Sequence, residues 1–274
     1  MSNILLRAIT GTIFISVILG SIWFGLLTSI IIISLISILS LNEYIDLFKN
    51  SEVSLNKSLV LIFGVSIFGI LLTEYIIGQD LLEINLSIFI LPILFGYLLT
   101  ELYRKKDNPL TNIGIGFIGF IYIFTPFILT LLILKKEIDA QYLLMGMFIL
   151  IWTNDTFAYL SGRFFGKTKL FERISPKKTW EGTIGGILFT AIAAIILSQF
   201  SDARYNLLFW VISALIIAPC SIFGDLFESL IKRSLNVKDS GTILPGHGGL
   251  LDRFDAALFT VPFFFTWMII YSQF

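Results

Sequence analysis

The sequence predicts an all-α, polytopic integral membrane protein with about nine transmembrane helices and a cytoplasmic N-terminus. Of its 274 residues, 56% are hydrophobic and only 14% are charged, whereas a soluble domain carries roughly 25% charged residues. The apolar residues gather into segments of about 20 residues, the length that a helix needs to cross a bilayer. Lysines and arginines are concentrated in every second connecting segment. Lipid is therefore the expected solvent for most of the chain.

Nine apolar segments are long enough to span a membrane. They lie at about 7–23, 26–47, 58–78, 84–103, 110–134, 140–162, 182–200, 205–223 and 249–271. The first resembles a signal peptide because Arg7 precedes it, but it lacks a small-x-small cleavage site and further spans follow, so we expect a retained helix. Pro126 is expected to kink the fifth segment. The single cysteine, Cys220, excludes an intramolecular disulfide and is expected to be a packing residue.

The distribution of basic residues predicts the orientation. If the N-terminus is cytoplasmic and nine helices alternate, 16 of the 19 lysines and arginines face the cytoplasm, and only Lys135, Lys136 and Arg204 lie outside. Such an excess is typical of cytoplasmic loops. We therefore expect a multi-pass protein of the cell inner (plasma) membrane, with the polar stretches 163–181 and 224–248 in the cytoplasm. The net charge of zero gives no indication of a nucleic-acid partner, and none is expected.

The second polar stretch begins with an amphipathic helix, 225–233. At 100° per residue, one face of that helix is polar and carries both signs of charge. Its members are Asp225, Glu228, Ser229 and Lys232. Asp252 and Asp255, three residues apart at the start of the last span, share a face near the membrane boundary. Ionisable groups at that depth cost a few kcal/mol each, so the acids need compensation.

Two interpretations of these acids remain open. They can form structural ion pairs with Lys232, Arg233 or Arg253. Alternatively, carboxylates from two helices can hold Mg²⁺, which keeps waters and shares the phosphate oxygens of a nucleotide. The mixture of acids with clustered lysines fits a metal together with a polyphosphate.

The first polar stretch and a glycine-rich turn supply further candidates. Asp155 lies in an otherwise apolar span and shares a helix face with Tyr159 and Gly162, which makes it a site candidate. The loop 175–179 offers hydroxyl and ammonium donors to phosphates, although its lysines also fit simple membrane anchors. The turn 246–249 precedes the last helix, whose N-terminus can bind an anion, but it also fits a linker. His247 is either a locally bonded turn residue or a phosphate contact.

These residues resemble the signature of the phosphatidate cytidylyltransferases, the CDP-diacylglycerol synthases. The matching positions run over 27 residues and comprise Ser229, Lys232, Arg233, Lys238, Asp239, Gly241, Leu244, Pro245, His247, Gly248, Gly249, Asp252, Arg253 and Asp255. Asp155 to Gly162 and Ser175 to Gly182 also resemble that family. At the level of motifs the likeness covers residues 150–274, and the N-terminal half matches only in its hydrophobic pattern.

The resemblance implies a nucleotidyltransferase that converts CTP and phosphatidate into CDP-diacylglycerol and pyrophosphate. It implies Mg²⁺, with K⁺ as an additional cation in some members, and a homodimer whose site opens to the cytoplasm and inner leaflet. Region 1–135 is expected to form the scaffold and dimer contacts, and 136–274 the catalytic region with cytoplasmic loops 163–181 and 224–248.

Roles follow for individual residues. We expect Asp225, Asp252 and Lys238 to be catalytic, and Asp225, Asp252 and Asp255 to bind the metal. Substrate binding is expected of Asp155, Ser175, Lys177, Lys178, Thr179, Lys232, Arg233, His247, Gly248 and Arg253.

Two other classes of function remain possible from the residues. Another CTP-dependent lipid enzyme, such as a polyprenol kinase or a cytidylyltransferase for ether lipids, shares this chemistry, because apolar helices encode the lipid tail poorly. A secondary transporter could use Asp155, Asp225 and Asp252 as a relay. Against a transporter, the sequence has no repeated broken-helix pattern, and its charges gather at one membrane face.

Overall fold

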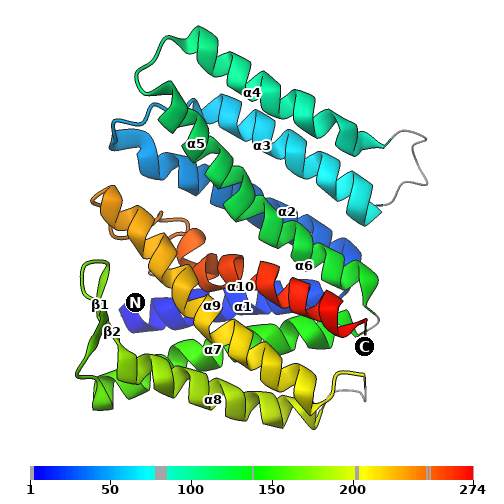
Figure 1. Cartoon of the computed structure of the whole chain (residues 1–274), viewed down its shortest axis with the longest axis vertical. Helices are drawn as coiled ribbons and strands as arrows, with labels where there is room; N and C mark the ends of the chain where they lie inside the picture. Colours follow the sequence, from blue (N-terminus) through cyan, green and yellow to red (C-terminus); the bar gives the residue numbers. More distant parts are fainter. Residues whose placement is uncertain are drawn as a thin grey trace. The chain divides into compact units, whose positions relative to one another are not determined.

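The computed structural model describes residues 3–77, 85–137, 139–200, 204–244, 246 and 248–273, with side chains from residue 9 onward. Within these residues the regular secondary structure is helical apart from one short two-stranded hairpin, as Figure 1 shows. The prediction of an all-α polytopic protein is confirmed, with that small sheet as an addition. The chain forms two compact units.

The first unit comprises residues 1–136 together with the segment 239–251. Its helices are α1 (Asn3–Trp23), α2 (Leu26–Leu47), η1 (Phe48–Asn50), α3 (Lys57–Leu71), η2 (Leu72–Ile77), η4 (Leu86–Phe89), α4 (Ile90–Arg104), α5 (Pro109–Gly119), η5 (Phe120–Phe124) and α6 (Thr125–Lys136). Helices α5, η5 and α6 follow one another without a break and form the predicted fifth span. Its irregularity is the π-helical η5, which ends two residues before Pro126; proline has no N–H to continue the α-helical ladder.

Helix α2 lies at the centre of the first unit. Leu41 and Tyr44 on α2 are almost fully buried, as are Phe124 of η5 and Leu131 of α6. The Tyr44 hydroxyl donates a hydrogen bond of 3.0 Å to the Ile115 carbonyl, so the polar end of this buried ring is satisfied. The C-terminal half of α2 is therefore fixed against α5 and α6.

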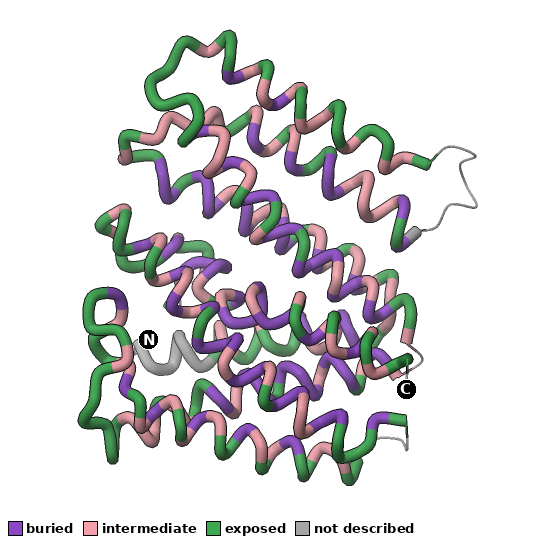
Figure 2. Tube along the Cα trace, in the orientation of Figure 1, coloured by how far each residue is buried: buried purple, intermediate pink, exposed green. Residues whose placement is uncertain are grey.

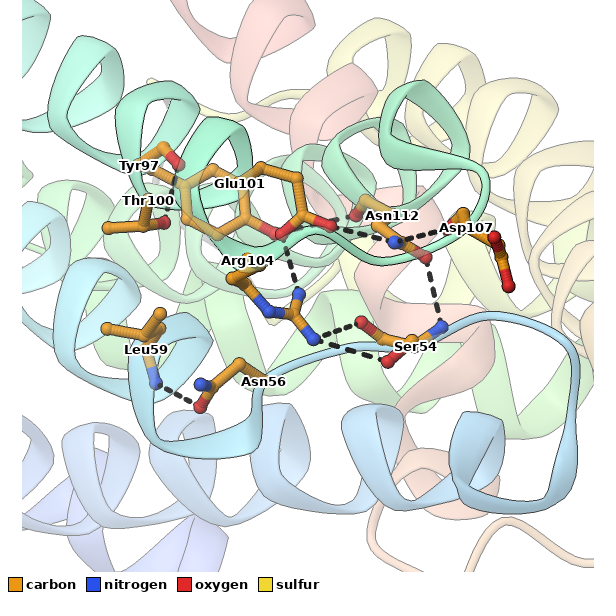
Figure 3. A network of polar contacts seen from close by, with 9 residues as sticks. All are labelled: Ser54, Asn56, Leu59, Tyr97, Thr100, Glu101, Arg104, Asp107 and Asn112. Atoms are coloured by element: carbon orange, nitrogen blue, oxygen red, sulfur yellow. Dashed lines mark hydrogen bonds and ion pairs between the residues drawn. The ribbon is translucent and has the colours of Figure 1, made fainter.

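A buried polar network joins α4, α5 and the connection between α2 and α3 (Figure 3). Asn112 donates to a Glu101 carboxylate oxygen at 2.7 Å and accepts from the Ser54 amide at 3.0 Å. Arg104 contacts the other Glu101 oxygen at 2.6 Å and donates to the Ser54 carbonyl at 2.6 Å. Glu101 and Asn112 are buried, and their mutual bonds compensate the loss of water.

Replacing Asn112 by alanine is expected to destabilise the protein by about 2 kcal/mol, because it removes a hydrogen bond to a buried charged group. The measurement is the fraction of detergent-solubilised protein that stays monodisperse after heating, followed over a temperature series. Asn42→Ala is the matched control, since the Asn42 contact with Asp46 is long, 3.4 Å, and exposed. Equal heat resistance of the two variants would contradict a stabilising role for the network.

The second unit comprises residues 137–238 and 252–274. Its elements are α7 (Ala140–Phe165), β1 (Lys169–Phe171), β2 (Ser175–Thr179), α8 (Trp180–Ser198), α9 (Leu207–Ser234) and α10 (Leu251–Tyr271). The polar residues 224–234 belong to α9, and the placement of 224–248 in the cytoplasm stays a prediction. The amphipathic pattern that predicted a helix over 225–233 is confirmed and continues the preceding span.

Small residues bring α7, α8 and α9 close together. A Cβ atom on Gly186 of α8 would lie 2.7 Å from the Asn154 Oδ1 atom of α7. Asn154 in turn donates a hydrogen bond of 2.6 Å to the Ser221 hydroxyl of α9. Membrane helices associate through such glycine contacts and interhelical hydrogen bonds, because lipid offers no hydrophobic driving force between them.

The outward faces of the helices are apolar. Among the described residues, eight helices are long and apolar enough to cross a membrane. Helix α4, for example, exposes Leu91, Phe95, Leu99 and Leu102, and Figure 2 shows exposed residues along its outer side. Apolar surface of this extent indicates a lipid environment. The first predicted span is represented by a shorter apolar helix, Ile9–Trp23; the count of nine and the cytoplasmic N-terminus stay predictions.

Candidate active site

A pocket of about 680 Å³ lies within the second unit. This volume is typical of ligand-binding sites. Its walls come from α7, the β1–β2 hairpin, α8, α9 and α10. The lining residues are Asn154, Asp155, Ala158, Tyr159, Gly162, Arg163, Lys169, Ser175, Lys177, Lys178, Thr179, Gly182, Thr183, Ile222, Asp225, Asp252, Asp255 and Ala256. The pocket therefore combines four aspartates with four basic side chains.

One face of α7 forms a wall of the pocket. Asp155, Tyr159 and Gly162 all line it, as their spacing along the helix predicts. Gly162 also permits close packing on α8, because a Cβ atom there would lie 3.1 Å from the Thr179 hydroxyl. The helical periodicity thus carries Asp155 from an apolar span into a polar cavity.

The hairpin brings the basic loop to the pocket. Strands β1 and β2 are antiparallel, and Ile174 between them packs with Leu170 against Ile222 and Leu226 of α9. Ser175, Lys177, Lys178 and Thr179 line the pocket, as expected for a phosphate-binding loop. Thr179 has a structural task as well: its hydroxyl accepts a hydrogen bond of 3.2 Å from the Gly182 amide and caps α8.

Three carboxylates meet on the facing sides of α9 and α10. Asp225, Glu228 and Asp255 each offer an oxygen, and these oxygens lie within 4.8 Å of one another. Asp225 and Glu228 are three residues apart on α9 and therefore share a face. Lys178 of the hairpin contacts the Asp225 carboxylate at 2.5 Å. We call Asp225, Glu228 and Asp255 the acidic triad.

Lys232 forms ion pairs with two carboxylates, Glu228 of the triad and Asp252. Its ammonium group lies 2.5 Å from a Glu228 oxygen and 2.6 Å from an Asp252 oxygen. Lys232 is 8% exposed and Glu228 is 2% exposed, so water screens this ion pair poorly. Both arrangements that the sequence left open therefore occur among these acids. Asp252 forms an ion pair with Lys232, whereas Asp225 and Asp255 belong to a cluster of carboxylates.

Four further predicted site residues that the structure describes do not line the pocket. Lys238 and Arg253 are exposed, and the exposed Arg233 donates to the Val237 carbonyl at 3.3 Å. Gly248 belongs to the first unit, where its carbonyl accepts a hydrogen bond from the Leu244 amide. His247 lies outside the described residues. Catalytic and substrate-binding roles for these five residues stay predictions.

Sequence reasoning missed Glu228 as a site residue. Its position on the polar face of 225–233 was recognised, and its spacing from Asp225 and Lys232 was the available signal. Glu228 lies one residue before the family signature, which begins at Ser229. Asn154, the neighbour of Asp155, was also missed; it is fully buried and lines the pocket.

Comparison with known proteins shows which family the chain belongs to. A model of the Cytidylyltransferase family matches residues 5–271, and the chain belongs to that family. A relative from Haemophilus influenzae, named phosphatidate cytidylyltransferase, is 34% identical over 250 residues, which cover 84% of this chain and 85% of the relative.

Relatives of the same printed name occur in other bacteria. One from Rickettsia felis is 39% identical over 185 residues, covering 65% of this chain and 79% of the relative. One from Staphylococcus haemolyticus is 41% identical over 145 residues, covering 53% of this chain and 52% of the relative. The family resemblance inferred from the C-terminal motifs is thereby confirmed, and it extends over nearly the whole chain.

Proposed function

We propose that this chain is an enzyme that makes CDP-diacylglycerol and pyrophosphate from CTP and phosphatidate, in phospholipid biosynthesis. The observation that carries the proposal is the mixed acidic and basic pocket of the second unit, in a membrane-embedded member of the Cytidylyltransferase family. Both substrates are anionic, and one of them is a lipid. A polar pocket built between apolar membrane helices suits that pair of substrates.

The chemistry requires charge neutralisation more than proton transfer. A phosphatidate oxygen attacks the α-phosphorus of CTP in line, a new P–O bond forms, and pyrophosphate leaves with the electrons of the broken P–O bond. The nucleophile is already an anion near neutral pH, so no side-chain base is needed. Two unit charges 4 Å apart repel by about 4 kcal/mol at an effective dielectric of 20. Positioning and electrostatic compensation are therefore the main tasks of the protein.

The basic side chains of the pocket can perform part of this compensation. Arg163, Lys169 and Lys177 line it and are exposed to it, so each can approach a phosphate without breaking a buried contact. Lys178 is shared with Asp225 and would contact a phosphate only by exchanging partners. We assign the first three to phosphate binding, and we assign Lys232 to holding Glu228 and Asp252 in place.

The acidic triad fits a divalent cation. Its donors are carboxylate oxygens, the ligands that Mg²⁺ prefers. Glu228 is buried, and while its Oε2 atom meets Lys232, its Oε1 atom has no hydrogen-bond partner among the described residues. An unsatisfied buried carboxylate oxygen is costly, and a cation would compensate it. We propose that Asp225, Glu228 and Asp255 hold Mg²⁺, which would neutralise phosphate charge when bound; K⁺ beside it is a further expectation.

Location and assembly are part of the proposal. The excess of basic residues in alternate loops supports a site that faces the cytoplasm from the inner membrane. The family resemblance supports a homodimer with contacts in 1–135. Light scattering of the protein in detergent measures the mass directly, and a monomer across all concentrations would remove the dimer.

The direct test is incubation of purified protein with CTP, phosphatidate and Mg²⁺, followed by mass spectrometry of the lipid and an assay of pyrophosphate. CDP-diacylglycerol with an equal amount of pyrophosphate is the expected result. Transfer of a phosphate in place of a cytidylyl group would indicate a lipid kinase. Absence of any CTP-dependent lipid product would overturn the proposal.

A further inference from the structure

The carboxylate of Glu43, in the first unit, is buried inside a glycine-rich part of the chain. Glu43 lies near the C-terminal end of α2 and is 4% exposed. It accepts a hydrogen bond of 3.1 Å from the amide of Leu251, a residue more than 200 positions away. Leu251 is the first residue of α10. A carboxylate from the N-terminal half thus caps the helix that carries Asp252 and Asp255.

The cap is favourable for two physical reasons. The first amides of a helix have no acceptor within the helix itself, and the N-terminal end of a helix carries a partial positive charge that stabilises an anion. A buried carboxylate also needs such donors, because burial removes its water. Glu43 and the start of α10 therefore satisfy each other.

Two glycines make room for this carboxylate. A Cβ atom on Gly241 would lie 2.5 Å from the Glu43 Oε1 atom, and its three nearest neighbours would all belong to Glu43. A Cβ atom on Gly249 would lie 2.6 Å from the Glu43 Oε2 atom. Gly249 also approaches the Ser240 hydroxyl and the Gly241 backbone. Gly241 and Gly249, near the two ends of the 239–251 segment, thus both lie against the end of the Glu43 side chain.

The contact with Glu43 explains why residues 241 and 249 are glycines. A phosphate-binding turn would not by itself require glycine at these positions. Neither Gly241 nor Gly249 has a positive φ angle, in contrast to Gly246 and Gly248. Their backbone conformation therefore permits a side chain, and only the close approach of Glu43 and its neighbours excludes one. Glycine at these two positions serves the packing of the segment.

We propose that Glu43 is a positioning residue, whose carboxylate fixes the 239–251 segment and the first turn of α10 and so orients Asp252 and Asp255. Its role in the reaction rests on the function proposed above. The C-terminal half of α2 is well packed, with Leu41 and Tyr44 almost fully buried, so the Leu251 amide is held by a carboxylate on a well-packed helix.

The structural part of the proposal is tested without any assay of activity. Hydrogen–deuterium exchange of peptides covering 240–255 is expected to accelerate about 10-fold or more in Glu43→Ala, because the Leu251 amide loses its buried acceptor. Glu52→Ala, which changes an exposed glutamate of the same unit, is the matched control. Unchanged exchange in Glu43→Ala would overturn the proposal, whether or not the protein proves to be a cytidylyltransferase.

The kinetic part separates positioning from substrate binding. In Glu43→Ala, kcat is expected to fall about 10-fold or more, since small displacements of positioned groups reduce rates strongly. The KM for CTP is expected to stay within about two-fold, because the basic residues lie on other elements. Glu43→Gln keeps an acceptor oxygen and the side-chain volume and should restore most of kcat. A glutamine variant as impaired as the alanine variant would contradict the hydrogen bond as the cause.

The single variant Gly241→Ala covers the case in which Glu43→Ala folds poorly, and a double-variant cycle tests the same contact where both fold. Gly241→Ala alone is expected to be impaired, whereas Gly69→Ala, where a Cβ atom meets nothing within 4 Å, should behave like the unchanged protein. In the Glu43→Ala background the extra methyl group has space, so Gly241→Ala should add no further loss. Losses that add, or an unimpaired Gly241→Ala, would overturn the close packing of Glu43 in this segment.

Discussion

Replacing Asp225 by asparagine is expected to lower the rate of CDP-diacylglycerol formation by about 100-fold or more, the effect typical of removing one preorganised electrostatic contact. The amide keeps the volume of the carboxylate but removes a negative charge from the acidic triad, where the three oxygens lie within 4.8 Å of one another. It also leaves Lys178, 2.5 Å away, without its anionic partner. The measurement is product formation across a series of Mg²⁺ concentrations. Activity equal to that of the unchanged protein would remove Asp225 from the site.

Asp46→Asn is the control for this change. Asp46 forms an exposed ion pair of 2.6 Å with Lys57 outside the pocket, and exposed pairs contribute little. A second readout is independent of turnover: Mg²⁺ should raise the melting temperature of the unchanged protein, as any ligand of the folded state does, and this rise should shrink in Asp225→Asn. Equal stabilisation of both proteins by Mg²⁺ would place the cation elsewhere.

The same titration distinguishes two assignments of the third carboxylate. The sequence motif favours Asp252, whereas the geometry favours Glu228, because an oxygen of Glu228 lies within 4.8 Å of oxygens of Asp225 and Asp255. If Glu228 is a ligand, Glu228→Gln should raise the Mg²⁺ concentration needed for half-maximal activity by about 10-fold, the scale of a lost ion contact. A larger shift in Asp252→Asn than in Glu228→Gln would restore the assignment made from sequence.

Replacing Lys232 by methionine is expected to destabilise the protein by about 3–5 kcal/mol, the cost of removing one partner from a buried ion pair. Methionine preserves the length of the side chain but leaves Glu228 and Asp252 as neighbouring buried carboxylates. The measurement is thermal unfolding in detergent with a thiol-reactive dye, since the single cysteine, Cys220, is buried and becomes reactive on unfolding. Lys57→Met, which breaks only the exposed pair with Asp46, should cost less than about 1 kcal/mol.

The companion variants decide the cause of that loss. Glu228→Gln in the Lys232→Met background removes one unpaired charge and should recover part of the stability. Normal stability of Lys232→Met together with a raised KM for CTP would indicate that Lys232 contacts the nucleotide, as the sequence predicts. The stabilising role of its ion pairs with Glu228 and Asp252 would then be wrong.

Composition and periodicity were sufficient to predict the class of fold, and together with the family resemblance they named eight residues of the pocket. An apolar segment of about 20 residues can satisfy its backbone in lipid only as a helix, so spans such as α2 and α7 follow from local sequence. Helical spacing likewise places Asp155 beside Tyr159 and Asp225 beside Glu228. Eight of the predicted site residues line one pocket: Asp155, Ser175, Lys177, Lys178, Thr179, Asp225, Asp252 and Asp255.

Only the tertiary structure decided how these residues share their charges. Whether Lys232 meets a phosphate or a carboxylate depends on how α9 packs against α10, and the spacing along one helix does not specify that packing. The hydrogen bond between Glu43 and Leu251 joins residues that are distant in sequence. From the sequence alone, Gly241 and Gly249 fit a simple linker, and only the structure shows the Glu43 carboxylate beside them. By itself the sequence determined which helices form and which faces are polar, because those depend on neighbours along the chain; the choice of partner for each buried charge depends on neighbours in space.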